Sequence, residues 1–397
     1  MMEASRRLLA VEESQTLVMT KKARELGATG VKVINLSIGE PDFETPQHIK
    51  EAAIQAIHDG YTHYPPVAGY PDLRKAISEK FKTQNNIYYA PEQIVVSCGA
   101  KHSIMNVIMS TINPGDEVII PAPYWVSYPA MVKLAEGKPI SLNSSIETDY
   151  KFDINDLKSS ITDRTKLFLF SSPCNPSGSV FSEEELREIA AVLQQHPKVM
   201  VISDEIYEHL QYGKGHTSIG SFPELKDRVI TVNGLSKAFA MTGWRIGYIG
   251  APLWVAKACE KLQGQFTSGA NSIAQMAAIE AISGSMEETE KMKATFSKRK
   301  KLLFDGLRAI KGIKPNSPEG AFYIFPDVSH YFGKQYKGDT INNSQDLCLF
   351  LLKNAHVSIV GGEAFGNPEC VRVSYAASES DLLEALDKIE KTLNLLN

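Results

Sequence analysis

The sequence predicts an α/β protein with a large domain, whose mostly parallel sheet is covered by helices on both faces, and a smaller α+β domain. In the middle of the chain, short apolar runs alternate with amphipathic helical patterns, as in parallel strands joined by crossover helices. After about residue 290 a long charged helix precedes a mixture of strands and helices. We expect an N-terminal arm over 1–47 that packs with a small domain over 291–397, and a large domain over 48–290.

The composition of the 397 residues indicates a globular enzyme, with 43% hydrophobic and 22% charged residues. The formal net charge of −4 argues against electrostatic binding of nucleic acid. No apolar run reaches the roughly 18 residues of a membrane span. The N-terminus mixes acidic with basic residues and lacks the apolar core of a signal peptide, so we expect a cytoplasmic protein. Scattered cysteines without a CxxC pair indicate reduced thiols: Cys98, Cys174, Cys259, Cys348 and Cys370.

Four apolar runs predict the strands that matter most for function. They are "QIVVS" (93–97), "KLFLFSS" (166–172), "KVMVISDE" (198–205) and "RVITVN" (228–233). A helical pattern, "KHSIMNVIMSTI", follows the first run, and "NPGDEVIIP" comes next. Another helix follows the second run and begins with a capping box of Ser182 and Glu185. Toward the C-terminus come "AFYIFPDV", "CVRVSYA" and the amphipathic "SESDLLEALDKIEKTLNLL".

Polar residues follow each of these four runs. In a parallel α/β sheet, ligands bind beyond the carboxyl ends of the strands, so we expect these residues to share one site. Because free N–H groups at a helix start attract anions, the first turn predicts a phosphate site. In chain order the candidates are Gly99 and Ala100, then Asn175, then Asp204 with Tyr207, and finally Ser236 with Lys237.

Each candidate also has a simpler interpretation. Gly99 could form only a turn, Asn175 between two prolines could form a loop, and Lys237 could lie on the surface. Asp204 with Glu205 could cap a helix. The combination matters more, because four independent turns rarely supply a phosphate cradle, an amide, a carboxylate with a phenol, and a lysine.

This combination meets the demands of pyridoxal phosphate. That cofactor needs a lysine for its aldehyde, an acid for its ring nitrogen, donors for its phenolic oxygen and a phosphate site. A lysine with an ordinary pKa near 10.4 must lose its proton before it can react. Burial and cationic neighbours lower that pKa. We therefore expect Lys237 to be the reactive amine and Asp204 the acid.

Motifs along nearly the whole chain resemble the class I aminotransferases of PLP fold type I, and more narrowly the bacterial aspartate aminotransferases of the subgroup found in thermophiles. The resemblance implies a seven-stranded, mostly parallel sheet in the large domain, and a homodimer with shared active sites. The motifs are "SIGEPDFETP" (37–46), "YPPVAGYPDLR" (64–74), "PYWVSYP" (123–129), "SSPCNPSG" (171–178), "SDEIYE" (203–208), "NGLSKAFAMTGWRIGY" (233–248) and "VRVSY" (371–375).

The resemblance also implies roles in holding the cofactor. Lys237 would bond to the aldehyde and then move the substrate Cα proton, while Asp204 would pair with the ring nitrogen. Tyr207 and Asn175 would bind the phenolic oxygen. Trp125 would stack on the ring, although alone it could be a core residue. The phosphate would be held by Ser236, Arg245, the backbone of Gly99, Ala100 and Lys101, and Tyr64 of the other subunit, a residue that alone could be a turn aromatic.

For the substrate, the resemblance implies that Arg372 forks onto the α-carboxylate, which the Gly39 backbone also contacts. Arg372 lies in an apolar run, where a charge must be paired or face a cavity. A dicarboxylate needs a second cation, and Lys101 with Ser14 and Thr16 matches the positions that supply it. Lys101 could instead be a solvated residue in a first helical turn.

The chain departs from the family at three positions. Cys174 stands where asparagine is usual and Ser177 where threonine is usual, but both are small and should leave Asn175 in place. Some members of the subgroup also use prephenate and have a basic residue near position 12. Here Glu12 and Glu13 stand there, which argues against prephenate activity.

The sequence therefore predicts a PLP-dependent aspartate aminotransferase that transfers the amino group of aspartate to 2-oxoglutarate by a ping-pong route. Substrates would be small molecules, and no metal, nucleic acid or membrane would take part. The nearest alternative is an aminotransferase of the same fold acting on aromatic or other neutral amino acids. A PLP-binding regulator would need a DNA-binding domain, for which the residues before "SIGEPDF" (from residue 37) leave no room. A structural or inactive homologue would have lost catalytic residues, and none is missing here.

Overall fold

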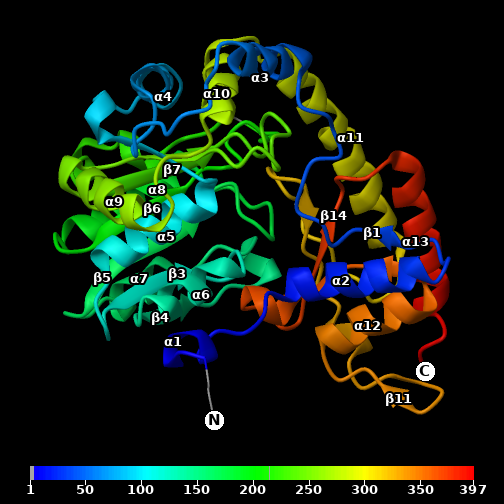
Figure 1. The fold of residues 1–397 in the computed structure, drawn as a ribbon. Helices are drawn as coiled ribbons and strands as arrows, with labels where there is room; N and C mark the ends of the chain where they lie inside the picture. Colours follow the sequence, from blue (N-terminus) through cyan, green and yellow to red (C-terminus); the bar gives the residue numbers. More distant parts are fainter. Residues whose placement is uncertain (1–3, 214) are drawn as a thin grey trace.

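The computed structural model describes residues 4–213 and 215–397, so residues 1–3 of the expected arm lie outside the described residues. One group of elements is built around a large sheet (Figure 1). A second group joins the N-terminal segment to the C-terminal third of the chain (Figure 1).

The large sheet has the seven-stranded, mostly parallel form that the sequence predicted. Its order is β2-β8-β7-β6-β5-β3-β4, and β8 runs antiparallel to both neighbours. All four predicted strands are confirmed, whereas no strand was predicted for β4 or β8. The bounds are β2 (Ile94–Ser97), β3 (Glu117–Pro121), β4 (Lys138–Leu142), β5 (Thr165–Ser171), β6 (Met200–Asp204), β7 (Val229–Gly234) and β8 (Gly247–Gly250).

Helices cover both faces of this sheet because successive strand residues point to opposite sides. In β3, Val118 and Ile120 pack with the cluster that includes α5, α6 and α9, whereas Ile119 packs with the cluster that includes α7 and α8. The capping box of Ser182 and Glu185 is confirmed at the start of α8. The helices are α3 (Gln47–His58), α4 (Pro71–Asn85), α5 (Ala100–Thr111), α6 (Ser127–Leu134), α7 (Ile154–Ser160), α8 (Glu183–Gln194), α9 (Leu253–Phe266) and α10 (Ser272–Ser283).

The second group shares one core between the two ends of the chain. Met19 and Leu36 pack in the same cluster as Phe296 and Leu382. Strand β1 pairs in parallel with β12, and β13-β14-β9 form a small antiparallel sheet. The bounds are α1 (Arg6–Leu9), α2 (Gln15–Ala28), β1 (Ile34–Asn35), α11 (Glu287–Ala309), β9 (Tyr323–Ile324), β10 (Gln335–Tyr336), β11 (Asp339–Thr340), α12 (Ser344–Asn354), β12 (Val357–Ser358), β13 (Val360–Gly361), β14 (Val371–Ser374) and α13 (Glu379–Leu393).

The strand register brings the predicted polar residues to one edge of the large sheet. Ser171 at the end of β5 pairs with Asp204 at the end of β6, and Asp204 pairs with Val232 of β7. Gly234 pairs with Gly247, which also pairs with Ser97 of β2. Within the described ranges, no helix is long and apolar enough to cross a membrane.

Candidate active site

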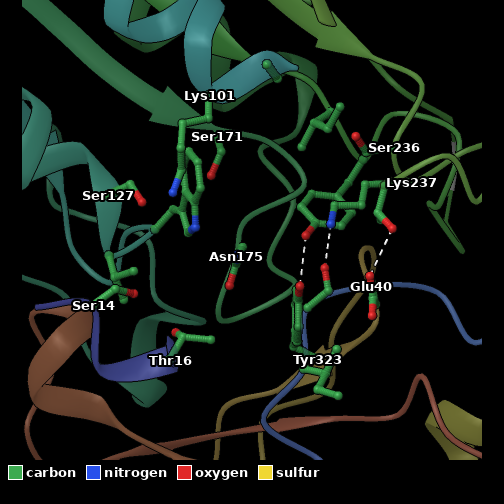
Figure 2. Close-up of a pocket in the computed structure, with 18 of the residues that line it drawn as sticks. Ser14, Thr16, Glu40, Lys101, Ser127, Ser171, Asn175, Ser236, Lys237 and Tyr323 are labelled. Atoms are coloured by element: carbon green, nitrogen blue, oxygen red, sulfur yellow. Dashed lines mark hydrogen bonds between the residues drawn. The ribbon is translucent and has the colours of Figure 1, made fainter. Parts of the chain in front are cut away.

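A cavity of about 380 Å³ lies at this edge of the sheet and is also bounded by residues of the second group. Two predicted site residues do not line it: Gly99, which directly precedes the lining residue Ala100 in the chain, and Tyr64, whose side chain is 94% exposed. The structure brings the others together around the cavity, several of them visible in Figure 2: Ser14, Thr16, Gly39, Ala100, Lys101, Trp125, Asn175, Asp204, Tyr207, Ser236, Lys237, Arg245 and Arg372.

Lys237 follows β7 and extends its amine into the cavity (Figure 2). The amine donates a hydrogen bond to the carbonyl of Gly39 and lies 5.9 Å from the ring centroid of Tyr207. Burial, followed by the charge of Arg372, lowers the pKa of Lys237 to about 8. Near neutral pH this lysine therefore has a far larger uncharged, reactive fraction than an ordinary lysine.

Asp204 ends β6, where its carboxylate accepts hydrogen bonds from the Tyr128 hydroxyl at 2.6 Å and the Ile206 amide at 3.3 Å. Burial raises the pKa of Asp204 to about 6, and the Tyr128 hydrogen bond opposes this rise. Sequence reasoning missed Tyr128, although its spacing of three residues from Trp125 could have placed both rings on one helical turn. A buried carboxylate held in this way is a suitable partner for a protonated ring nitrogen.

Tyr207 lies three residues beyond the end of β6 and is fixed by a second phenol. Its hydroxyl lies 2.9 Å from that of Tyr323, a residue of β9. Burial, followed by the neighbouring Tyr323, raises the pKa of Tyr207 well above its usual value, so the phenol stays protonated. Sequence reasoning did not identify Tyr323, because "AFYIFPDV" reads as an ordinary apolar strand.

The start of α5 and the segment before β8 form a cradle for an anion. Gly99, with φ of +86°, precedes the first turn of α5 and offers no side-chain cap, so the first amides have no partner within the helix. Arg245 adopts the left-handed region with φ of 59° and donates to the Thr242 carbonyl at 2.8 Å. A Cβ at Gly247 would lie 2.1 Å from the Ala100 nitrogen, so only glycine lets the two segments meet.

Gly243 has no such role. No atom of the described residues lies within 4 Å of the Cβ that a substitution would add there. Both Gly243 and Gly247 stand in "NGLSKAFAMTGWRIGY", so residue type alone does not distinguish the one that a close approach requires.

Arg372 is a buried guanidinium on β14 whose donors are only partly used. It donates to Asn175 Oδ1 at 3.0 Å and to the Ser37 carbonyl at 2.6 Å, and it stacks 4.5 Å from the ring centroid of Tyr323. Its Nε has no acceptor among the described residues. Since a buried charge needs a partner, this arginine is suited to a carboxylate in the cavity. A Cβ at Gly39 would lie 2.8 Å from the Tyr323 hydroxyl, so glycine keeps this end open.

Another part of the cavity carries Lys101 with two hydroxyls from the N-terminal segment. The Lys101 amine lies 4.9 Å from the ring centroid of Trp125, and Ser14 and Thr16 lie below it in Figure 2. Desolvation lowers the pKa of Lys101, and the nearby Arg245 adds to this effect. Glu40, a lining residue that the sequence did not single out, accepts a hydrogen bond from Thr242 at 2.9 Å.

The family model of class I and II aminotransferases matches residues 31–389, nearly the whole chain. The chain belongs to this family. The resemblance drawn from the motifs is therefore confirmed, together with the fold class of this PLP-dependent family.

Curated relatives and solved structures agree with this assignment. A bifunctional aspartate aminotransferase and glutamate/aspartate-prephenate aminotransferase of Petunia hybrida is 48% identical, over 98% of this chain and 82% of its own length. An aspartate/prephenate aminotransferase of Nitrosomonas europaea is 45% identical, over 99% of this chain and 100% of its own length. The aspartate aminotransferase structure from Rhizobium meliloti matches with a TM-score of 0.96 and 41% identity over all of both chains. The Thermus thermophilus enzyme with maleate matches with a TM-score of 0.93 and 39% identity, over 99% of this chain and 100% of its own.

As a member of this family, the aminotransferase uses pyridoxal phosphate. The lining residues fit that group, since a lysine with a lowered pKa, a buried acid and an open helix start surround one cavity. The two departures in the loop after β5 do not remove Asn175 from the site: Cys174 contacts the Pro123 carbonyl at 3.3 Å, Ser177 is buried, and Asn175 lines the cavity.

Proposed function

We propose that this aminotransferase transfers the amino group of L-aspartate to 2-oxoglutarate, giving oxaloacetate and L-glutamate. One observation carries the proposal. Besides Lys237 and Arg245, which the cofactor would engage, the cavity is lined by three further cations, Arg372, Lys101 and Arg24. Arg372 and Lys101 suit substrates with two carboxylates, because each carboxylate needs its own partner in a desolvated site.

Several residues would hold the cofactor, with Trp125 against its ring. Asp204 would accept the ring N–H, Tyr207 and Asn175 would bind the phenolic oxygen, and the α5 start would bind the phosphate with Ser236 and Arg245. When bound, pyridoxal phosphate supplies an aldehyde that bonds amines and a pyridinium ring that takes up electrons released at the substrate Cα.

Lys237 moves the proton that defines the reaction. With its amine free, Lys237 would take the proton from the substrate Cα as a general base and give it back as a general acid. Its low pKa keeps a useful fraction uncharged near neutral pH. The second oxoacid uses the same groups in reverse order, so ping-pong kinetics are expected.

Arg372 and Lys101 orient the substrate in this proposal. Arg372 binds the α-carboxylate through two hydrogen bonds beside the Gly39 backbone. Its contacts to Asn175 and Ser37 fix the plane of its guanidinium group. Lys101, with Ser14 and Thr16, binds the distal carboxylate. Several curated relatives at 45–48% identity have names that include aspartate, which supports this assignment.

Prephenate is a second candidate acceptor, because several relatives at 45–46% identity are named aspartate/prephenate aminotransferases. Against it, the subgroup resemblance associates that activity with a basic residue near position 12. Glu12 is exposed and does not line the cavity.

A panel of amino donors with 2-oxoglutarate, and of acceptors that includes prephenate, tests the proposal. We expect aspartate to give the highest kcat/KM among the donors, and Lys101→Ala to lower that value while leaving phenylalanine less affected. Activity with phenylalanine far above that with aspartate would reject the dicarboxylate assignment. An unchanged aspartate kcat/KM in Lys101→Ala would reject the role of Lys101.

The remaining features of the proposal concern the whole enzyme. It is a cytoplasmic homodimer in which Tyr64 of one subunit reaches the phosphate of the other, consistent with the 94% exposure of Tyr64 in the single chain.

The chain divides near residues 47 and 290, and the shared core of the arm and the C-terminal elements supports this division. Closure of the small domain would exclude water from the proton transfer.

A further inference from the structure

One cation of the cavity has no role in the function proposed above. Arg24 lies on α2 and lines the cavity together with Thr16, Leu17 and Thr20. It makes no hydrogen bond or ion pair with any of the described residues, whereas the neighbouring Lys21 approaches Glu25. An arginine without a partner beside a site for anions is available to bind one.

The helical spacing puts these residues on one face of α2. Positions 17, 20 and 24 are separated by three and four residues, and position 16 lies one turn before position 20. This face carries two hydroxyls, an apolar side chain and a cation. Leu17 is 68% exposed and lines the cavity, so its side chain is available to a ligand there.

Along α2, Arg24 lies about two turns beyond Thr16, one of the hydroxyl residues assigned to the distal carboxylate. Eight residues separate Thr16 from Arg24, which corresponds to about 12 Å along a helix. Because helical side chains lean toward the N-terminus, the long Arg24 side chain can extend back over part of this separation. A substrate that reaches it needs a longer apolar chain than aspartate has.

Thr20 also connects this face to the α-carboxylate end of the site. Its hydroxyl lies 3.4 Å from that of Ser37, and the Ser37 carbonyl accepts from Arg372 at 2.6 Å. Helix α2 is therefore held in a defined position relative to the arginine that orients the substrate.

We propose that Arg24 is a specificity-determining residue that binds the second carboxylate of dicarboxylates longer than aspartate, whose methylene groups pack on Leu17. This inference rests on the proposed dicarboxylate function. Lys101 binds the distal carboxylate of four-carbon substrates, and Arg24 extends the range to acids with five or more carbons.

Binding of inert dicarboxylates to the cofactor-loaded enzyme tests the inference without catalysis. Succinate, glutarate and adipate have neither an amino nor an oxo group, and isothermal titration calorimetry gives their dissociation constants. We expect Arg24→Gln to weaken glutarate and adipate about fivefold and succinate less than twofold, the range for an exposed ion pair. The matched control is Lys22→Gln, which removes the same charge from the other side of α2, outside the cavity, and should leave all three constants unchanged.

Three outcomes would overturn the inference: equal weakening of all three acids, equal effects of the Arg24 and Lys22 substitutions, or no effect of Arg24→Gln. Equal weakening of the three acids, or equal effects of the two substitutions, would mean that Arg24 acts only through the overall charge of the protein and not through contact with the ligand. Monocarboxylic hexanoate separates these failures from failure of the proposed function. If the wild-type enzyme binds dicarboxylates no better than hexanoate, the dicarboxylate assignment itself is wrong and the inference falls with it. If it binds succinate tightly and Arg24→Gln has no effect, the inference alone is wrong.

Discussion

At the scale of single residues, the chemistry of the site depends on how burial changes proton affinity. The low pKa of Lys237 makes its amine reactive near pH 8, and the raised pKa of Asp204 leaves its carboxyl ionised only above about pH 6. Both groups are therefore mostly in their useful forms from about pH 8 upward.

The reactivity of Lys237 should follow this pKa. In the cofactor-free protein, the rate of yellow adduct formation with pyridoxal phosphate should rise with pH to a midpoint of about 8 and then level off. Between about 8 and 10.5 the unfolded chain binds more protons than the folded one, so the contribution of Lys237 to the free energy of unfolding rises with pH in that window. Stopped-flow absorbance measures the rate. A midpoint near 10 would contradict the effect of burial.

The hydrogen bond from Tyr128 should keep Asp204 ionised for the cofactor. Tyr128→Phe removes a donor to a buried carboxylate and should raise the pKa of Asp204. A hydrogen bond to a charged group is worth about 1.5–3 kcal/mol, so the dissociation constant for pyridoxal phosphate should rise roughly tenfold or more. Fluorescence titration of the cofactor-free protein measures it. The control is Tyr124→Phe, whose hydroxyl does not contact Asp204, and equal effects of the two substitutions would refute the explanation.

Sequence reasoning found the residues of the site whose chemical type is unusual for their surroundings. Lys237 and Arg372 are charges in apolar segments, so each required an explanation. Tyr128 and Tyr323 were missed because an aromatic residue among apolar neighbours is normally core, and their hydroxyl partners come from distant segments. Only the tertiary structure distinguishes a phenol that contacts Asp204 from one that fills space.

At the scale of elements, the approach of β8 to α5 shapes the anion cradle. Gly247→Ala would place a Cβ against the Ala100 amide, so the first turn of α5 must move. Overpacking of this kind costs about 1–3 kcal/mol, and we expect weaker binding of pyridoxal phosphate, by roughly tenfold. Gly243→Ala is the matched control in the same segment, since its Cβ meets open space. Equilibrium titration with pyridoxal phosphate measures the affinity of both variants. An unchanged affinity in Gly247→Ala would show that the close approach of β8 to α5 is not needed for binding.

A buried ion pair connects α4 to the segment that follows β6. Lys80 binds Glu208, which also accepts from Asn85 at 2.6 Å and Asn233 at 2.7 Å. Burial alone would raise the pKa of Glu208, but the Lys80 ammonium holds it well below its usual range. Removing one partner leaves an uncompensated charge, so Lys80→Met should lower the free energy of unfolding by about 3–5 kcal/mol.

Urea unfolding measures this loss, with Lys82→Met as the control on the same helix. Lys82 forms an exposed pair with Glu79 at 3.7 Å, and its removal should cost under about 1 kcal/mol. Comparable losses for the two variants would mean that the buried pair contributes no more than the exposed one.

Strand prediction succeeded where burial on both faces makes a strand apolar throughout, as in β5, β6 and β7. It missed β4, whose exposed and half-buried residues give no continuous apolar run. It also missed β8, whose four residues begin and end with glycine. Neither strand has a local signal strong enough to separate it from a loop, and both are specified by the neighbours with which they pair.

At the scale of the whole molecule, the exposed Tyr64 predicts that an active site needs two subunits. Tyr64→Ala and Lys237→Ala should each be nearly inactive, and mixing them after reversible dissociation should restore activity. Each mixed dimer would then have one complete site, with Lys237 from one subunit and Tyr64 from the other. Steady-state assays measure the recovery, and analytical ultracentrifugation confirms exchange. If subunits exchange without recovery, Tyr64 does not act across the interface.

The reversed direction of β8 has a consequence for which molecules can fit. Since β7 ends and β8 begins at the same edge of the sheet, the loop over 235–246 leaves the edge and returns to it. Lys237 lies near the start of this loop and Arg245 near its end. The pairing of Gly234 with Gly247 holds the two ends of the loop together, and in this way it sets the separation between the Lys237 amine and the Arg245 guanidinium. We expect insertions in this loop to weaken the binding of pyridoxal phosphate, because they would change the separation of the amine and the guanidinium without changing either residue.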